Sequence, residues 1–265
     1  MLRSHVTAPP LLRAKAYDQP SLFTPENLLR EARRQKSRTA GVVPGVGILD
    51  PDGDIVRYLR WSGHATLNPH WACYHTELYD FEYDGLSFGI IGCAVGASFA
   101  VLAAEELFAS GCRLLISMTS AGQVLAKGDP PYFVLIERAL RDEGTSYHYL
   151  PPSDYAEIDP AIRDRLQDAL AAQPEPVHVG ASWTTDAPFR ETPTAIEAAR
   201  REEVLAVEME AAALYAFSKA RQKPVVCFAH VTNQMATIEG DFEKGAFAGS
   251  RSALDVVAAA AKALQ

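Results

Sequence analysis

The sequence predicts a single α/β domain in which a mixed, largely parallel, twisted central sheet is flanked by helices. Strand-like apolar runs alternate with helical patterns from about residue 88 onward, an order typical of parallel strands joined by crossover helices. The 265 residues are 48% hydrophobic and 22% charged, so a large core is available and one α/β unit accommodates the chain. We find no internal repeat, linker or low-complexity tract.

The first 40 residues are expected to form an N-terminal arm and a helix, and residues 41–265 the α/β domain. Residues 1–20 are rich in proline and predict an extended segment. Thr24 followed by Pro25 is typical of a helix N-cap with proline at the first helical position. A helix is therefore predicted over residues 26–35, with basic residues at its end, where the helix dipole favours them.

The segment from residue 41 to 93 is predicted to contain mainly strands. Gly41–Leu49 is apolar and glycine-rich, and Ile55–Leu59 follows the turn signal Asp52-Gly53. Asp84-Gly85 predicts a hairpin turn. Strands are expected over residues 41–49, 55–59, 74–83 and 88–93.

The remaining segment alternates between strands and helices. Helices are predicted over residues 97–109, 160–171, 193–203, 211–221 and 250–264. Strands are predicted over residues 112–118, 132–137, 177–184, 205–207 and 224–230.

Charge and composition disfavour several classes of protein. Lys and Arg total 25 against 33 Asp and Glu, a net charge of −8, which disfavours a nucleic-acid partner. No apolar run reaches 18 residues, so no membrane span is expected. The N-terminus lacks the apolar stretch of a signal peptide, and four scattered cysteines suit a reducing compartment, so a cytoplasmic location is expected.

Two groups of cysteine and histidine residues were weighed as chemical sites. His64, His70, Cys73 and His75 are close in sequence, but their spacing fits no common zinc pattern, so a polar loop without metal is expected. Cys93 could be a thiol nucleophile, but a cysteine buried at a strand end is the preferred interpretation.

The most informative segment is Ala206–Tyr215, where Glu208, Met209 and Glu210 stand at a strand-to-helix junction. In extended geometry the two carboxylates share a face, and the helix N-terminus behind them is electropositive. A carboxylate there is expected to stay ionised and to accept hydrogen bonds from two adjacent hydroxyls, as in a sugar 2′,3′-diol. Met209 would offer apolar surface to the sugar. The alternative is that acidic residues simply favour the first turn of a helix.

This junction and other segments together resemble the nucleoside phosphorylase family, specifically the uridine phosphorylase-like branch of the nucleoside phosphorylase/nucleosidase superfamily. The resemblance extends over residues 41–264, in the family's order. Its segments are Gly92–Ser98, a glycine-rich loop before a helix; Thr119–Val124, a turn after a strand; Thr184–Phe189, beside the base; and Val231–Asn233. Nucleotide-binding motifs of the G-x-G-x-x-G and G-x-x-x-x-G-K-[ST] types are absent from the sequence.

The resemblance implies cleavage of an N-glycosidic bond by phosphate, which releases a free purine or pyrimidine base and (deoxy)ribose 1-phosphate. Phosphate is a co-substrate in this reaction, and no other cofactor is implied. The resemblance also implies a homo-oligomer, from dimer to hexamer, in which a neighbouring subunit completes each pocket. Catalytic roles are implied for Glu210 and Asn233, and substrate contacts for Ser120, Gly122, Phe189, Arg190, Glu208 and Met209. Trp183 is a rival to Phe189 for stacking on the base.

The chain departs from the family at the phosphate site. The Gly-Asp-x-x-Arg loop of relatives corresponds here to Gly45–Asp50, and Ser117 and Tyr74 stand where two further arginines are expected. Candidate replacements are Arg57, Arg60, Arg190 and His75. Two alternatives therefore stay open: a nucleoside hydrolase in which Asp50 or Asp52 activates water, and a nucleoside-binding protein without catalysis.

Overall fold

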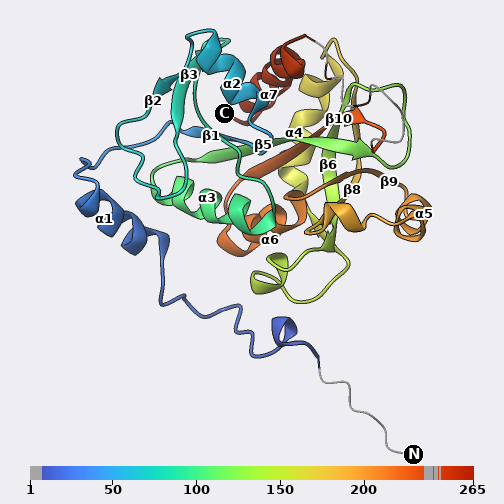
Figure 1. Cartoon of the computed structure of the whole chain (residues 1–265), viewed down its shortest axis with the longest axis horizontal. Coiled ribbons are helices and arrows are strands. Elements are labelled where there is room, and N and C mark those ends of the chain that lie inside the picture. Colours follow the sequence, from blue (N-terminus) through green and yellow to red (C-terminus); the bar gives the residue numbers. More distant parts are fainter. Residues whose placement is uncertain (1–7, 236–240, 242–243, 245) are drawn as a thin grey trace, which may run out of the picture.

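The computed structural model describes residues 8–235, 241, 244 and 246–265. These residues form one ten-stranded sheet with helices on both faces, which confirms the predicted α/β class (Figure 1). The sheet follows the order β10-β6-β8-β9-β5-β1-β4-β3-β2, and β7 (Tyr155–Glu157) pairs with β6. The strands are mixed in direction, as expected.

The first half of the sheet is parallel at its centre. Strand β1 (Val46–Asp50) lies between β4 (Leu86–Gly92) and β5 (Leu114–Gln123), parallel to both. An antiparallel edge follows, in which β3 (Tyr79–Tyr83) pairs with β4 through the predicted hairpin and β2 (Thr66–Leu67) pairs with β3. Strand β2 was not predicted, because two exposed residues carry no periodic signal.

The second half of the sheet closes on itself through β5. Strand β10 (Val225–Asn233) runs parallel to β5, and β9 (Val204–Glu208) pairs antiparallel with the end of β5. Strands β6 (Tyr132–Asp142) and β8 (Val177–Thr185) connect β10 to β9. The result is a ring of five strands. β5 reaches Gln123, so most of the turn predicted over Thr119–Val124 is strand.

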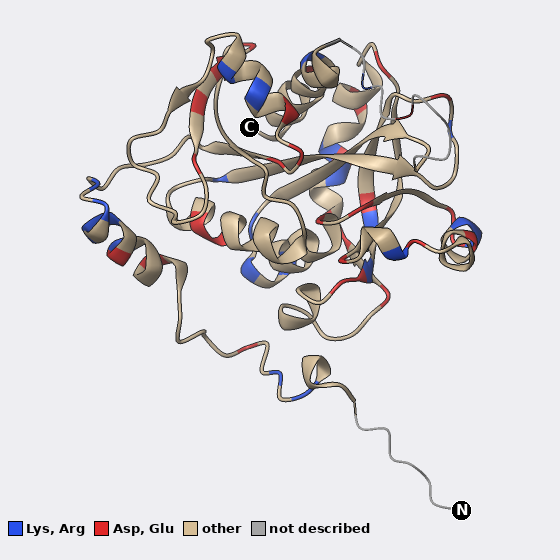
Figure 2. Cartoon of the chain, viewed as in Figure 1, with Lys and Arg blue, Asp and Glu red and all other residues tan. Residues whose placement is uncertain are grey.

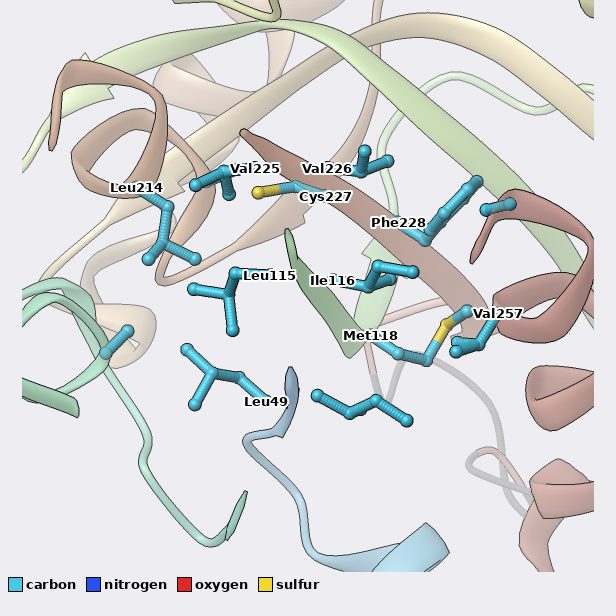
Figure 3. Packing of buried hydrophobic residues seen from close by; sticks show 14 of the residues in the cluster. Leu49, Leu115, Ile116, Met118, Leu214, Val225, Val226, Cys227, Phe228 and Val257 are labelled. Atoms are coloured by element: carbon cyan, nitrogen blue, oxygen red, sulfur yellow. The ribbon is translucent and has the colours of Figure 1, made fainter. Parts of the chain in front are cut away.

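Alternating side chains of β5 and β10 fill the core on both faces of the sheet (Figure 3). Leu115, Val225 and Cys227 point toward α6, where Leu214 meets them, whereas Ile116 and Phe228 point toward α7. Helices α3 (Ala97–Ala109) and α6 (Ala211–Arg221) cover one face, and α2 (Asp54–Trp61), α4 (Pro160–Ala171) and α7 (Ser250–Leu264) cover the other (Figure 1). Both sides of the central strands are therefore buried, which explains their nearly continuous apolar sequences.

The strand predicted over Ile55–Leu59 is wrong, because this segment belongs to α2. Ile55, Val56 and Leu59 are buried on one side of the helix, the spacing of an amphipathic helix, although the short run also has the composition of a strand. The Asp50 carboxylate accepts hydrogen bonds from the backbone N–H groups of Gly53 and Val56 and holds the start of the helix.

The described part of the N-terminal segment extends away from the sheet (Figure 1). It contains a single 3-10 turn, η1 (Pro10–Leu12), and then α1 (Pro25–Gln35), which packs on α3. Thr24 caps α1 as predicted, its Oγ1 accepting a hydrogen bond from the Asn27 backbone N–H. A further helix, α5 (Pro193–Arg201), lies beside β9.

Charges of both signs are interspersed over the chain, with acidic and basic residues side by side on α1 and α5 (Figure 2). In the part of the chain that the structure describes, every helix is too short or too polar to cross a membrane.

Candidate active site

A pocket of about 960 Å³ opens at the carboxyl ends of the parallel strands. Its lining comes from the residues after β1, from the second half of β5, and from the ends of β9 and β10. The loop after β8 and the helix α5 line it further out. This edge of an open or partly closed α/β sheet is where ligands of such folds bind.

Glu210 lies at the bottom of the pocket, at the N-cap of α6. Its side chain is 1% exposed. One carboxylate oxygen accepts a hydrogen bond from the Gly96 N–H at 2.7 Å, and the other accepts from Thr119 Oγ1 at 3.1 Å. The second oxygen also accepts from the Met209 backbone N–H at 3.3 Å, so of the about four hydrogen bonds that a carboxylate can accept, one position stays open for a ligand hydroxyl.

Glu208 lies next to Glu210 but is held by the protein itself. Its carboxylate accepts hydrogen bonds from Ser182 Oγ, from Thr184 Oγ1 and from the backbone N–H groups of Glu210 and Ala211. Although Glu208 contributes to the pocket wall, these four donors occupy its acceptor positions. The side chain fixes the junction between β9 and α6 and thereby positions Glu210.

The expectation that this carboxylate stays ionised is wrong for Glu210. Burial and the neighbouring Glu208 carboxylate raise the pKa of Glu210 to about 8, and the donors from Gly96 and Thr119 only partly oppose this. Of the two acids, Glu208 has more donors to support a negative charge, so Glu210 carries the proton at neutral pH. Proximity to the helix N-terminus does not offset the loss of water around Glu210.

Asp52 also lines the pocket, close enough to Glu210 for its charge to help raise the pKa of that group. Its Oδ2 accepts a hydrogen bond of 2.7 Å from the backbone N–H of Ser120, and Lys244 Nζ lies 4.0 Å from its Oδ1. Lys244 also contacts Asp54 Oδ2 at 2.6 Å. A backbone N–H and an ammonium group therefore converge on a position that holds an anion, and the anion there is Asp52.

The other residues considered for phosphate or water lie elsewhere. Asp50 is 2% exposed, caps α2 and does not line the pocket. Arg57 binds Asp54 and the Asp52 carbonyl, and Arg60 stacks on Tyr79. Neither these arginines nor His75 lines the pocket of their own chain, so the fold of one chain does not bring them to the place of the phosphate-binding arginines.

The outer end of the pocket is more apolar and suits a planar ring. Phe189 and Met235 line it, with Phe189 almost fully exposed, whereas Met209 lines the pocket next to Glu210. Trp183, the rival to Phe189, is buried away from the pocket and donates a hydrogen bond to Asp142. Arg190 is exposed and also lies outside the lining.

Asn233 and Gly122 lie together beside this end of the pocket. The Asn233 amide donates to the Ala121 carbonyl at 3.4 Å and accepts from the Met235 N–H at 2.9 Å. A Cβ added at Gly122 would stand 3.0 Å from Met235 Cγ and 3.4 Å from Asn233 Oδ1, so glycine leaves the room that this arrangement needs.

Sequence reasoning missed several groups that the fold brings to the pocket. Thr119 and the Gly96 N–H hold Glu210, and Lys244 approaches Asp52. Glu191 and Arg200 line the outer end. The glycine-rich loop was a signal for Gly96, but no local pattern links positions 191, 200 and 244 to residues of β5.

The cysteine and histidine groups lie outside this pocket. Cys93 is exposed rather than buried as expected, because the chain leaves β4 at a positive φ of 63° and turns the side chain outward. Across the described ranges, no three His, Cys, Asp or Glu side chains come together in a way that could hold a metal ion.

The fold and the pocket define an α/β protein with a polar small-molecule site at the carboxyl edge of its sheet. The sequence profile of the Phosphorylase superfamily matches residues 57–264. The chain therefore belongs to this superfamily.

Three curated relatives carry the names of nucleoside phosphorylases. A guanosine phosphorylase from Halorubrum lacusprofundi is 27% identical over 143 residues, which cover 54% of this chain and 59% of the relative. A uridine phosphorylase from Thermococcus kodakarensis is 25% identical over 51% of this chain and 52% of the relative. A DeoD-type purine nucleoside phosphorylase from Jannaschia sp. is 28% identical over 71% of this chain and 82% of the relative. The match thus spans little more than half of the first two relatives.

Solved structures show the same fold. Two structures of uridine phosphorylase from Vibrio fischeri ES114 superpose with TM-scores of 0.67 and 0.69 at 20% and 19% sequence identity. They cover 84% and 87% of this chain and 91% and 97% of the respective relatives.

Proposed function

We propose that this chain cleaves the N-glycosidic bond of a nucleoside in the pocket at the carboxyl edge of the sheet. The observation that carries the proposal is Glu210, a buried acid with spare acceptor capacity, held by Gly96 and Thr119 at the end where Asp52 stands. A ribose there would donate a hydrogen bond from a hydroxyl group to Glu210, and the base would extend toward Phe189 and Met235.

The arrangement suits a reaction with a positively charged sugar. When the glycosidic bond breaks, the sugar develops oxocarbenium character and the base leaves with negative charge. The Asp52 carboxylate lines the pocket close to Glu210 and would stabilise the cation more strongly than the neutral substrate, which is what catalysis requires, whereas Glu210 would hold the ribose.

Phosphate is the preferred nucleophile in this proposal, supported by the names of the three curated relatives. The Ser120 N–H and the Lys244 ammonium are the donors that would hold it. Asp52 would have to swing away from Ser120 first, because a carboxylate and a phosphate repel each other in one site.

Water is the second candidate, and the contact between Asp52 and Ser120 favours it. The carboxylate already fills the anion position, next to the sugar end of the pocket, where it could accept a proton from an attacking water molecule. This reading makes the chain a nucleoside hydrolase on the same fold.

One assay tests the proposal and separates its two forms. Free base is measured chromatographically after incubation of the purified chain with a panel of nucleosides, with and without phosphate. Release that requires phosphate supports phosphorolysis, and equal release without it supports hydrolysis. If nucleosides bind but no base is released, the alternative of a binding protein replaces the enzyme.

A substitution of Asp52 makes the distinction independent of trace phosphate. In a hydrolase, Asp52→Asn removes the base that activates water and should lower kcat by about a hundred-fold or more. In a phosphorylase, the same change removes a competing negative charge, so the KM for phosphate should fall. Glu82→Gln, an exposed carboxylate on β3, is the control for loss of one charge.

A further inference from the structure

Two charged side chains at the outer end of the pocket are not used in the mechanism above. Glu191 follows the short turn η3 (Pro188–Arg190), and Arg200 lies in the last turn of α5. Both line the pocket. Thr192 caps α5 between them, its Oγ1 accepting from the Ala195 N–H, so the two side chains stand on one short, anchored segment.

The Glu191 carboxylate is available to a ligand. No hydrogen bond or ion pair within the described residues involves it, and partial burial raises its pKa. A half-buried carboxylate without a partner has free acceptor positions, and a ligand with N–H groups can donate hydrogen bonds to them.

Arg200 is oriented by one contact and keeps its other donors. Its Nε donates to the Val124 carbonyl at 2.9 Å, immediately beyond the end of β5. The exposed ion pair at the end of α5 is made by the neighbouring Arg201 with Glu197. The guanidinium of Arg200 therefore reaches the pocket with its terminal N–H groups unused among the described residues.

Strand β5 sets the separation of these groups from the sugar end. Thr119 contacts Glu210 and Val124 contacts Arg200. Five residues of extended strand span roughly 16 Å. This length leaves room for a bicyclic base between the ribose and Arg200.

We propose that Glu191 and Arg200 select a 2-amino-6-oxopurine base, so that guanosine-type nucleosides are the preferred substrates. This inference rests on the proposed function and names its substrate class. A carboxylate only accepts hydrogen bonds, and the guanine edge with N1–H and the 2-amino group presents two adjacent donors to it. Arginine pairs with the O6 and N7 acceptors of the same base.

Other common bases fit this pair of side chains less well. Uracil offers one N–H between two carbonyl oxygens, which a carboxylate repels. Adenine and cytosine place an acceptor nitrogen beside their amino group. Hypoxanthine keeps O6, N7 and N1–H but lacks the 2-amino group, so inosine is the matched comparison for Glu191.

The test measures equilibrium binding of guanosine and inosine to the purified full chain by dialysis, together with turnover. Guanosine should bind about ten-fold to a hundred-fold more tightly than inosine. Glu191→Gln should remove most of this preference by weakening guanosine alone. Arg200→Lys should weaken both nucleosides by a similar factor, because both present O6 and N7. The control Glu197→Gln removes a carboxylate of α5 outside the pocket and should leave the ratio unchanged.

The inference would be overturned if Glu191→Gln weakened guanosine and inosine binding equally. It would also be overturned if the native chain preferred uridine or adenosine. In both cases the proposed cleavage would stand. Selective binding of guanosine without base release would support the assignment of Glu191 and overturn the proposed cleavage. The binding measurement thus separates failure of one proposal from failure of the other.

Discussion

At the scale of single residues, the two glutamates of the β9–α6 junction divide two tasks between them. Glu208 is satisfied by four protein donors, whereas Glu210 has two strong contacts and faces the pocket. The sequence predicted the pair and its location at a strand-to-helix junction. It could not predict which carboxylate is free, because Ser182, Thr184 and Thr119 come from other strands.

Substitution of Glu210 should abolish recognition of the sugar. Glu210→Gln keeps the shape but cannot ionise, so above about pH 8, where native Glu210 is ionised, kcat/KM for nucleosides should fall by about a hundred-fold or more. Affinity for the free base should change little, because the base lies at the other end of the pocket. Calorimetry with nucleoside and free base measures both, and undiminished nucleoside affinity would contradict the assignment of the site.

The raised pKa of Glu210 also predicts how nucleoside binding depends on pH. The ionised carboxylate is a stronger acceptor for a ribose hydroxyl than the neutral acid, and the ionised form becomes populated as the pH approaches about 8. Nucleoside Kd should therefore decrease as the pH rises from 6 to 8. The Glu210→Gln variant should show no such dependence over this range, and a native affinity that is independent of pH would argue against a role for the ionised carboxylate.

At the scale of elements, the periodic segments were predicted well and the short or composite ones were not. Helices α3, α4, α6 and α7 have the predicted bounds, because each is long and clearly terminated. Helix α2 was mistaken for a strand, since its start depends on a hydrogen bond from the Val56 N–H to the Asp50 carboxylate that local sequence does not reveal. The extension of β5 was missed because its last residues pair with β9, which is distant in the chain.

One hydroxyl group of helix α6 bridges two strands of the ring. Tyr215 Oη donates to the Ile136 carbonyl of β6 and accepts from the Cys227 N–H of β10. Tyr215→Phe leaves a buried N–H without a partner, so the free energy of unfolding should fall by about 1–3 kcal/mol. Denaturant titration measures this, with the surface variant Tyr17→Phe as control. Unchanged stability would show that the backbone groups find other partners.

At the scale of the whole molecule, buried acids set how stability depends on pH. Burial raises the pKa of Asp50 to about 7 and that of Glu210 to about 8, from ordinary values of 3.8 and 4.5. These two acids bind more protons in the folded chain than in the unfolded chain between about pH 4 and pH 8. The buried His230, whose pKa falls to about 4, opposes them below about pH 6.5, but it is one group against two, so stability should fall as the pH rises from about 5 to 8. Glu210→Gln should flatten the upper part of this dependence. A stability that increases from pH 5 to 8 would contradict the assigned shifts.

We also propose that the chain assembles as a homo-oligomer. Large apolar side chains are exposed on separate elements, including Trp61 on α2 and Val95 beside the pocket. Sedimentation at micromolar concentration should give a species well above the chain mass of 28.8 kDa. A single species at the monomer mass would refute this expectation.

The contact between Asp52 and Ser120 bears on how such a site can evolve. The donor is a main-chain N–H inside the closed ring of strands, and every residue except proline carries that group. Mutation can therefore hardly erase the anion-binding position. It can only change what fills it. Under the proposed function, a change of the single codon at position 52 would open the Ser120 N–H to an outside anion and so decide between phosphate and water.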